Sequence, residues 1–328
     1  MAFSPWRLTL WAAVISTALG TQLTLPSKDP WYSPPAGFES RQPGAILRVR
    51  EAPSNLTSLV ANKTAAAYQL LFRSTDARYK PSWGVTTVFL PSKASQAGRN
   101  ARALVSYQIP YNAIDVDQSP SYGLSTLYGE PIMLNVREGL SRGWAVSVPD
   151  FEGPQAAFTA GLQAGHAVLD SVRAVLAWDK FQGPDKVRYA MWGYSGGALA
   201  SNFAAERQAS YAPELSFAAA AIGGVPSNFT RIIYNVTGSG VAAIVPYALL
   251  GVTAQYPDAR EYLVRHLRKE GPYNATVFLA ALHATLEDNV SAFSGQDIFQ
   301  YFTNGEAILN APELVRALGD NWHMGYRE

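Results

Sequence analysis

The feature that most constrains this chain is a short stretch that predicts a strand, a tight turn and a helix in succession. Residues 187–192 (Val-Arg-Tyr-Ala-Met-Trp) are typical of a strand, residues 193–197 are Gly-Tyr-Ser-Gly-Gly, and the small residues at 198–205 favour a helix. This is the G-x-S-x-G pattern in the context it requires, because only small neighbours let strand and helix approach around a strained serine. The pattern predicts Ser195 as a nucleophile and the N–H of Gly196 as an oxyanion donor. The competing interpretation is a glycine-rich turn that carries an unreactive serine.

Three further segments predict strands that precede this turn, at residues 84–90, 103–109 and 144–148. Between the last of them and the strand before Ser195, residues 155–178 have apolar side chains at helical spacing. Strand, helix and strand in this order indicate a parallel sheet, and therefore an α/β fold. The Pro- and Gly-rich residues 21–45 predict an extended N-terminal arm.

The first twenty residues have the pattern of a secretory signal peptide. Arg7 precedes the apolar residues 8–15, and the small residues Ala18 and Gly20 follow. A buried N-terminal helix is the alternative. No later stretch has the roughly 18 apolar residues of a transmembrane helix, so no membrane anchor is expected. Six Asn-x-Ser/Thr sequons also favour a secreted, extracellular glycoprotein with these positions on its surface: Asn55, Asn62, Asn228, Asn235, Asn274 and Asn289.

Composition limits the chemistry. The formal net charge of +1 gives no basic excess to neutralise phosphates, so a nucleic-acid partner is not expected. The absence of cysteine excludes disulfides, thiolate metal sites and a cysteine nucleophile. The four histidines, at 166, 266, 283 and 323, are not spaced as a metal-binding pair. We therefore expect neither a metal nor a cofactor.

Several segments together resemble the fungal secretory lipase family, which includes the Candida lipase A-like enzymes. The matching pieces include Val-Pro-Asp-Phe-Glu-Gly-Pro at 148–154, Gly-His-Ala-Val-Leu-Asp at 165–170 and Met-Trp-Gly-Tyr-Ser-Gly-Gly-Ala-Leu-Ala at 191–200. Others are Asp-Pro-Trp-Tyr at 29–32, Ser-Tyr-Gln-Ile at 106–109 and Gly-Gly-Val-Pro at 223–226. The resemblance extends from about residue 29 to residue 226.

This resemblance implies an α/β-hydrolase fold with a mostly parallel central sheet and an inserted helical cap. It implies hydrolysis of acylglycerols through an acyl-enzyme on Ser195, with Gly196 as one oxyanion donor. The family places an Asp as second donor, and Asn112 stands at the matching position, with Asp115 and Asp117 close by as alternatives. An Asn amide can also donate a hydrogen bond. The cysteine that the family often has before Ser-Pro-Ser-Tyr is Gln118 here.

The expected domain organisation follows. Residues 1–20 are the signal peptide, 21–226 the hydrolase core with its arm, 227–320 a helical cap and 321–328 a truncated return to the core. Apolar runs at 241–252 and 276–286 and an amphipathic segment at 258–269 predict cap helices. The Gly-Ser-Gly at 238–240 is either a lid hinge or a plain loop.

The other two members of a catalytic triad are not found in the sequence. In this fold the acid and the histidine follow the serine along the chain. His266 and His283 fall in predicted cap helices, which leaves His323 as a weak candidate, and His166 precedes the nucleophile. We therefore expect that the chain stops after the cap, with the last core strands missing. Asp150 and Glu152, at a strand end, are a possible glycosidase-like pair of acids.

Three hypotheses of function follow. The first is a secreted, monomeric triacylglycerol lipase or carboxylesterase that acts on an ester substrate at a lipid–water interface. The second is an acyltransferase on the same fold, in which an alcohol replaces water when the acyl group leaves the enzyme. The third is a catalytically inactive, lipid-binding relative, which the missing histidine favours.

Overall fold

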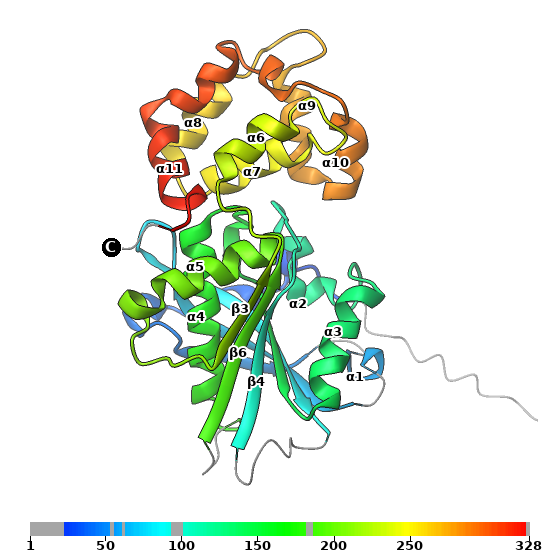
Figure 1. The fold of residues 1–328 in the computed structure, drawn as a ribbon, viewed down its shortest axis with the longest axis vertical. Helices are drawn as coiled ribbons and strands as arrows, with labels where there is room; N and C mark the ends of the chain where they lie inside the picture. The colour runs from blue at the N-terminus through cyan, green and yellow to red at the C-terminus, as the bar shows by residue number, and fades with distance from the viewer. Residues whose placement is uncertain (1–22, 53–55, 61–62, 93–100, 182–185, 326–328) are drawn as a thin grey trace, which may run out of the picture.

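A seven-stranded sheet and a separate group of helices make up the two halves of the molecule in the computed structural model (Figure 1). The structure describes residues 23–52, 56–60, 63–92, 101–181 and 186–325. The predicted signal peptide lies outside these residues, and so do the sequons at Asn55 and Asn62.

The sheet has the strand order β1-β2-β3-β5-β4-β6-β7. Its strands are β1 (Ile46–Glu51), β2 (Thr64–Thr75), β3 (Pro81–Pro91), β4 (Ala101–Gln108), β5 (Ala145–Pro149), β6 (Lys186–Tyr194) and β7 (Ala219–Gly223). Strands β1, β2, β3 and β5 pair antiparallel in succession, whereas β5, β4, β6 and β7 are parallel. The four predicted strands are present as β3, β4, β5 and β6, within a few residues of their predicted limits. Strands β1, β2 and β7 were not predicted.

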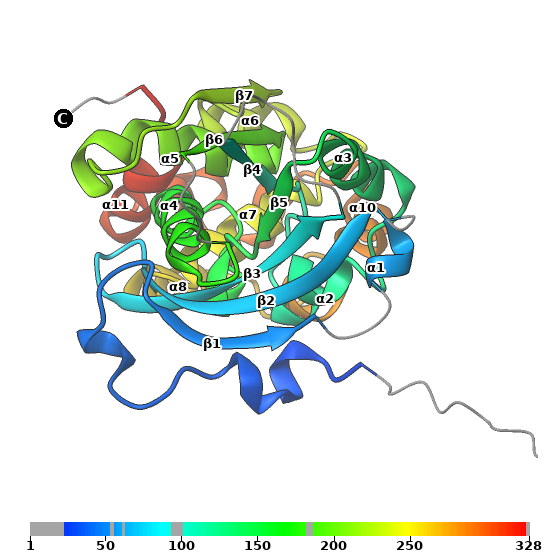
Figure 2. The same cartoon turned by 90° about the horizontal axis from the view of Figure 1, so that it is seen from below.

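Helices cover both faces of the sheet (Figure 2). The helices α4 (Gly161–Ala177) and α5 (Gly196–Tyr211) pack on one face, and α3 (Glu130–Ser141) packs on the other. Two glycines in α4 let it approach α5 closely, because a Cβ on Gly165 would lie 2.8 Å from the backbone carbon of Phe203. The short helices α1 (Leu56–Leu59) and α2 (Pro120–Gly123) lie in connections.

The helix predicted over 155–178 begins six residues later than expected. Residues 156–160 form a loop in which Ala156 (φ 45°) and Thr159 (φ 64°) adopt left-handed backbone conformations, which interrupt a right-handed helix. This loop reaches the second half of the molecule. The Trp322 indole donates to Thr159 Oγ1 (3.0 Å), and the backbone N–H of Leu162 donates to Asn321 Oδ1 (3.1 Å).

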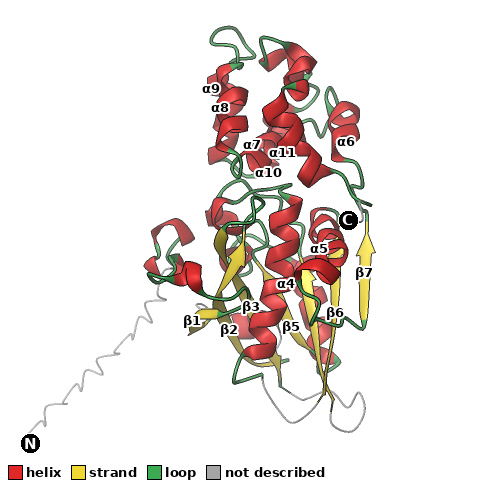
Figure 3. Ribbon diagram, turned by 90° about the vertical axis from the view of Figure 1, so that its left-hand side faces the viewer, coloured by secondary structure: helices red, strands yellow, loops and turns green. Residues whose placement is uncertain are grey.

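The second half, here named the helical unit (residues 229–322), lies beyond the carboxyl ends of the parallel strands, toward which the arrowhead of β7 points (Figure 3). It contains α6 (Phe229–Val236), α7 (Ile244–Thr253), α8 (Pro257–Arg265), α9 (Ala275–Ala280), α10 (Leu286–Phe293) and α11 (Pro312–Trp322). The apolar run at 241–252 supplies α7, which is buried along most of its length. The run at 276–286 is divided between α9 and a 3₁₀ turn. No helix within the described ranges is long and apolar enough to cross a bilayer.

Candidate active site

Ser195 lies on the turn that joins β6 to α5. Strand β6 ends at Tyr194 and α5 begins at Gly196, so a single residue connects them. Its backbone has φ 54° and ψ −119°, a strained conformation for a residue with a side chain. The Ser195 N–H donates to the carbonyl of Gly223 at the end of β7 (3.0 Å), which holds the turn in place. Ser195 itself is exposed to solvent.

The glycines around Ser195 are required by close backbone contacts. A Cβ on Gly197 would overlap the carbonyl oxygen of Gln108, the last residue of β4. A Cβ on Gly193 would overlap the carbonyl oxygen of Gly197, the second residue of α5. The strand, the helix and the neighbouring strand therefore meet without space for a side chain, as the G-x-S-x-G interpretation requires.

Asn112 lies against Gly196, the residue after the predicted nucleophile. A Cβ on Gly196 would overlap Asn112 Oδ1, and Asn112 has a left-handed φ of 47°. Its Oδ1 has no hydrogen-bond partner among the described residues. The Oδ1 atom is therefore not held, and a 180° turn of the amide would present Nδ2 at the same place. The Asn112 amide thus lies against Gly196, the first residue of α5.

The neighbouring acids have other roles. Asp115 accepts a hydrogen bond from the N–H of Asp117 (2.9 Å) and caps a 3₁₀ turn. Asp117 binds the N–H and the hydroxyl of Ser27 in the N-terminal arm, both at 2.7 Å. Of these three residues, Asn112 is the one that lies against the turn at Ser195.

The structure describes all four histidines, and none of them lies on the turn at Ser195. Both ring nitrogens of the buried His166 lack a hydrogen-bond partner among the described residues. His323 follows α11, and its backbone bridges to Asn228. His266 Nδ1 is 2.9 Å from the carbonyl oxygen of Tyr262, and His283 is exposed at the end of a 3₁₀ turn. The role of His323 as base stays a prediction.

His166 is part of the core. Its ring stacks on Tyr211 with centroids 4.1 Å apart and meets Tyr79 edge-on at 5.2 Å. Burial disfavours the charged imidazolium and lowers the pKa of His166 to about 4. A neutral, packed imidazole in this position stabilises the contact between α4 and α5.

The acids Asp150 and Glu152 do not form a glycosidase-like pair. Asp150 is 4% exposed and accepts the N–H (2.8 Å) and the hydroxyl (2.5 Å) of Ser121. Glu152 is 2% exposed, and its Oε2 accepts the N–H of Ala113 (2.9 Å). Burial raises the pKa of Asp150 to about 7 and that of Glu152 well above its ordinary value. Asp150 lines a cavity of about 200 Å³ that Glu152 does not reach, so the two acids do not face each other across a substrate cleft.

The sequons differ in exposure. Asn235 is exposed, whereas Asn228 and Asn274 are half-buried and cap α6 and α9 through their side-chain oxygens. Asn289 contradicts the expectation of a surface position. It is 4% exposed, and its Nδ2 donates to Tyr247 Oη (2.8 Å) and to the carbonyl of Thr285 (3.0 Å). The apolar contacts of α10, which a sequon does not encode, bury this residue.

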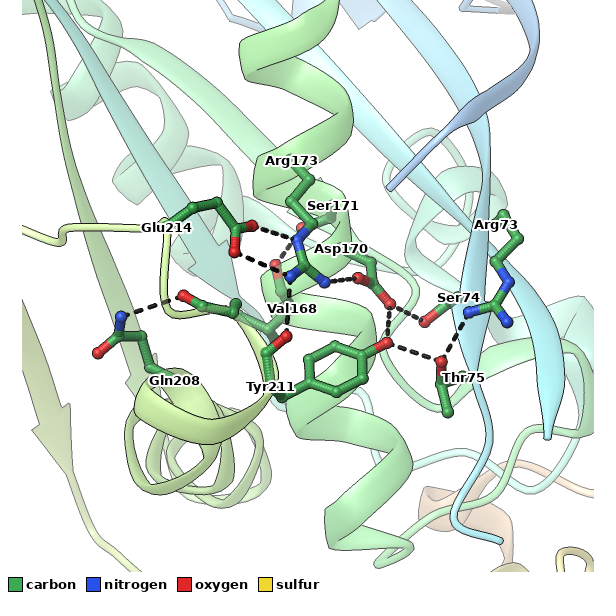
Figure 4. Close-up of polar contacts among 11 residues, drawn as sticks. Arg73, Ser74, Thr75, Val168, Asp170, Ser171, Arg173, Gln208, Tyr211 and Glu214 are labelled. Atoms are coloured by element: carbon green, nitrogen blue, oxygen red, sulfur yellow. Dashed lines mark hydrogen bonds and ion pairs between the residues drawn. The ribbon is translucent and has the colours of Figure 1, made fainter. Parts of the chain in front are cut away.

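Asp170 and Arg173 of α4 belong to a network of charged and hydroxyl groups (Figure 4). This network was not predicted from the sequence. The Asp170 carboxylate accepts hydrogen bonds from Ser74, Tyr211 and Arg173, each at 2.8 Å. Arg173 also pairs with Glu214 (2.6 Å). Burial raises the pKa of Asp170 to about 6 despite these donors. The signal in the sequence was an acid and an arginine three residues apart, Asp170 and Arg173, in a mostly apolar helix. No cluster of three or more His, Asp or Glu side chains suited to a metal occurs in the described part of the chain.

Comparisons with known proteins identify relatives among fungal ester hydrolases. The "Secretory lipase" family profile matches residues 120–324. A trichothecene C-3 esterase of Fusarium sporotrichioides is 44% identical, over 98% of this chain and 74% of its own length. A probable trichothecene esterase of Stachybotrys chartarum is 41% identical (92% and 63%), and lipase A of Arthroderma benhamiae is 36% identical (90% and 64%). The chain therefore spans between about three fifths and three quarters of the length of these relatives.

Solved structures of lipases and esterases share the fold of this chain. Candida antarctica lipase A, in its closed state, superposes with a TM-score of 0.79 at 26% identity, over 91% of this chain and 69% of its own. The rice cell wall degrading esterase LipA of Xanthomonas oryzae superposes with a TM-score of 0.64 at 14% identity, over 86% and 80%, and shows the fold alone. The predicted α/β-hydrolase fold is confirmed. With its strand–serine–helix turn, its mixed central sheet and these matches, the chain belongs to the secretory lipase family.

Proposed function

We propose that this protein hydrolyses carboxylic esters with Ser195 as the nucleophile and with the Gly196 N–H and the Asn112 amide as oxyanion donors. The observation that carries the proposal is the strained backbone of Ser195 (φ 54°), which exposes the serine beside Gly196 and Asn112. In this proposal both donors hold the negative charge that develops on the ester carbonyl oxygen in the tetrahedral intermediate. The relatives described above support ester hydrolysis as the class of reaction.

In the proposed reaction, Ser195 Oγ forms a bond to the carbonyl carbon of the ester while its proton passes to a base. The tetrahedral oxyanion is held by the two donors. The carbon–oxygen bond to the alcohol then breaks, and the alcohol leaves with a proton. Water repeats these steps on the acyl-enzyme, which releases the acid and restores Ser195. The base is not identified among the described residues, and His323 is the first to test.

Covalent labelling tests the nucleophile. The wild-type chain, Ser195→Ala and Ser210→Ala are treated with a fluorophosphonate probe, and labelling rates are measured. Ser210 is a matched control, because it is an exposed serine on the same helix. We expect labelling of the wild type and of Ser210→Ala, and none of Ser195→Ala. A folded wild type that labels no faster than Ser195→Ala would overturn the proposal, and would leave the lipid-binding alternative.

The proposed substrates are acylglycerols at a lipid–water interface, supported by the family and by lipase relatives such as lipase A of Arthroderma benhamiae. A second candidate is a trichothecene ester, favoured by the 44% and 41% identity to trichothecene esterases. Parallel assays on a triacylglycerol emulsion and on a trichothecene esterified at C-3 separate the two. Addition of an alcohol acceptor reveals transfer of the acyl group in place of hydrolysis. Release of acid from neither ester would exclude both.

We also propose that residues 1–20 direct secretion and that the protein is a monomer. In the same proposal, residues 227–320 serve as a cap over the site, and residues 321–328 return toward the core. The family description supports secretion. The position of the helical unit beyond the carboxyl ends of the parallel strands supports the cap. The segment 238–240 is held in the cap, since Gly238 donates to the Gln296 carbonyl (2.8 Å), which favours a loop over a hinge. N-terminal sequencing and light scattering of secreted protein test the signal peptide and the monomeric state.

A further inference from the structure

We propose that Glu152 is a positioning residue for Asn112, and that it acts through a pair of hydrogen bonds that clamp the two residues flanking Asn112. The inference rests on the proposed function, because it assigns Asn112 as an oxyanion donor. It gives a role to a buried acid that the reaction itself does not use.

The clamp consists of two hydrogen bonds in opposite directions. The N–H of Ala113, immediately after Asn112, donates to Glu152 Oε2 (2.9 Å). The N–H of Glu152 donates to the hydroxyl of Tyr111, immediately before Asn112 (2.6 Å). All of these groups are buried, with Tyr111 6%, Ala113 0% and Glu152 2% exposed. One residue therefore fixes both neighbours of Asn112 at sites closed to water.

The backbone conformation of Asn112 benefits from such support. Its φ of 47° lies in the left-handed region, which asparagine adopts more readily than other side-chain-bearing residues but only as single residues, and the clamp stabilises it there. This conformation is what directs the side chain onto Gly196. An oxyanion donor must be held within about 0.5 Å of its working position, which a loop without such bonds does not achieve.

The clamp is anchored to rigid structure. The carbonyl of Glu152 accepts the Gln163 amide of α4 (2.7 Å) and the N–H of Ala157 (2.8 Å). The ring of Phe151 meets Tyr111 edge-on with centroids 4.8 Å apart. Displacement of Tyr111 or Ala113 would therefore disturb packed core residues. Because Asn112 lies between these two residues in the chain, the same contacts oppose its displacement.

The chemistry of the clamp needs one acceptor oxygen and no charge. Glu152 Oε1 has no hydrogen-bond partner among the described residues, and burial favours the neutral carboxyl. A glutamine keeps the length of the side chain and one carbonyl oxygen, so it can accept from Ala113 in the same way. An alanine leaves the Ala113 N–H without a partner. The pair Glu152→Gln and Glu152→Ala therefore separates positioning from charge.

The test measures kcat and KM on a soluble p-nitrophenyl ester, with thermal unfolding as a check of folding. We expect Glu152→Ala to lower kcat by about 10- to 100-fold at nearly unchanged KM, as a misplaced catalytic group does. We expect Glu152→Gln to retain kcat within about threefold of wild type. If Glu152→Ala does not fold, Tyr111→Phe, a milder change, takes its place. Its expected loss of kcat lies between that of Glu152→Gln and that of Glu152→Ala. Wild-type kcat in a folded Glu152→Ala or Tyr111→Phe would overturn the inference.

A double-mutant cycle shows whether Glu152 acts through Asn112. In an Asn112→Ala background, Glu152→Ala is expected to cause no further loss of kcat, because the donor is already absent. Additive losses would show that Glu152 acts by another route and would contradict the inference.

Amide hydrogen exchange tests the clamp without activity. The Ala113 N–H is expected to be protected in the wild type and in Glu152→Gln, and to exchange at least tenfold faster in Glu152→Ala. Unchanged exchange would overturn the clamp even if the enzyme is active. A wild type that shows this protection but has no Ser195-dependent activity would instead refute the proposed function, so the two failures are distinguishable.

Discussion

The carbonyl oxygen of Gln108 occupies the place where a side chain of Gly197 would begin. Gly197→Ala is therefore expected to destabilise the fold by about 2–3 kcal/mol, because backbone cannot move aside as a flexible side chain does. Gly319→Ala is the control. Gly319 lies on α11, and no atom comes within 4 Å of the place that its Cβ would take, so the change is expected to stabilise by up to about 1 kcal/mol. Urea unfolding measures both, and equal effects would contradict this account of the elbow.

Asn112→Ala is expected to lower the Ser195-dependent rate by about 100- to 1000-fold, since one of two oxyanion donors is lost. Unfolding temperature is expected to fall slightly, because alanine adopts a φ of 47° less readily than asparagine, although Asn112 Oδ1 has no partner to lose among the described residues. Asn135→Ala, at an exposed position of α3, is the control and is expected to keep its rate. Ester hydrolysis and thermal unfolding are measured side by side. An unchanged rate in a folded Asn112→Ala would exclude Asn112 as a donor.

Asp170→Ala is expected to destabilise the protein by about 3–5 kcal/mol, because the half-buried Arg173 loses one partner and two hydroxyls lose an acceptor. Glu138→Ala removes the exposed ion pair with Arg142 and is expected to change stability by less than about 0.5 kcal/mol. Urea unfolding of both variants gives the comparison. Similar losses of stability in the two variants would show that the network in Figure 4 contributes no more to stability than an exposed ion pair.

Asn289 is expected to remain unglycosylated in folded, secreted protein, and Asn235 is expected to carry a glycan. The Nδ2 atom of Asn289, to which a glycan would attach, is buried and bonded to Tyr247. Peptide mass spectrometry after enzymatic deglycosylation in heavy-oxygen water reports the occupancy of each position. Asn289→Gln is also expected to destabilise the protein and Asn235→Gln to leave stability unchanged. A fully occupied Asn289 in folded protein would contradict the position of α10.

Asp150→Asn is expected to change the pH dependence of stability. The folded pKa of Asp150 is about 7, whereas an unfolded aspartate titrates near 4. Between these values the folded state holds more protons, so wild-type stability falls as pH rises from about 4 to about 7. The asparagine does not titrate. The wild type is therefore expected to lose about 2–4 kcal/mol relative to the variant between pH 4.5 and pH 8. Urea unfolding of both proteins at pH 4.5 and at pH 8 tests this. A difference in unfolding free energy between wild type and variant that is the same at both pH values would contradict the raised pKa.

The parts of the fold that were predicted from the sequence depend on local patterns. The elbow at Ser195 and the strands β3, β4, β5 and β6 have apolar runs with clear breaks, so nearby residues specify them. Strand β7 was missed because it is short, rich in alanine and exposed at an edge of the sheet. The start of α4 was misplaced because Ala156 and Thr159 adopt left-handed conformations that their residue types do not announce.

The sequence by itself determined the fold class, the family and the position of a strained serine, because the order of strand, small residues and helix leaves few other structures. Only the tertiary structure decided which side chains meet around that serine. It brings Asn112 onto Gly196, holds Asn112 through Glu152, and buries Asn289 and His166. These relationships join residues distant in sequence, and their energies depend on burial and backbone approach, which no local pattern records.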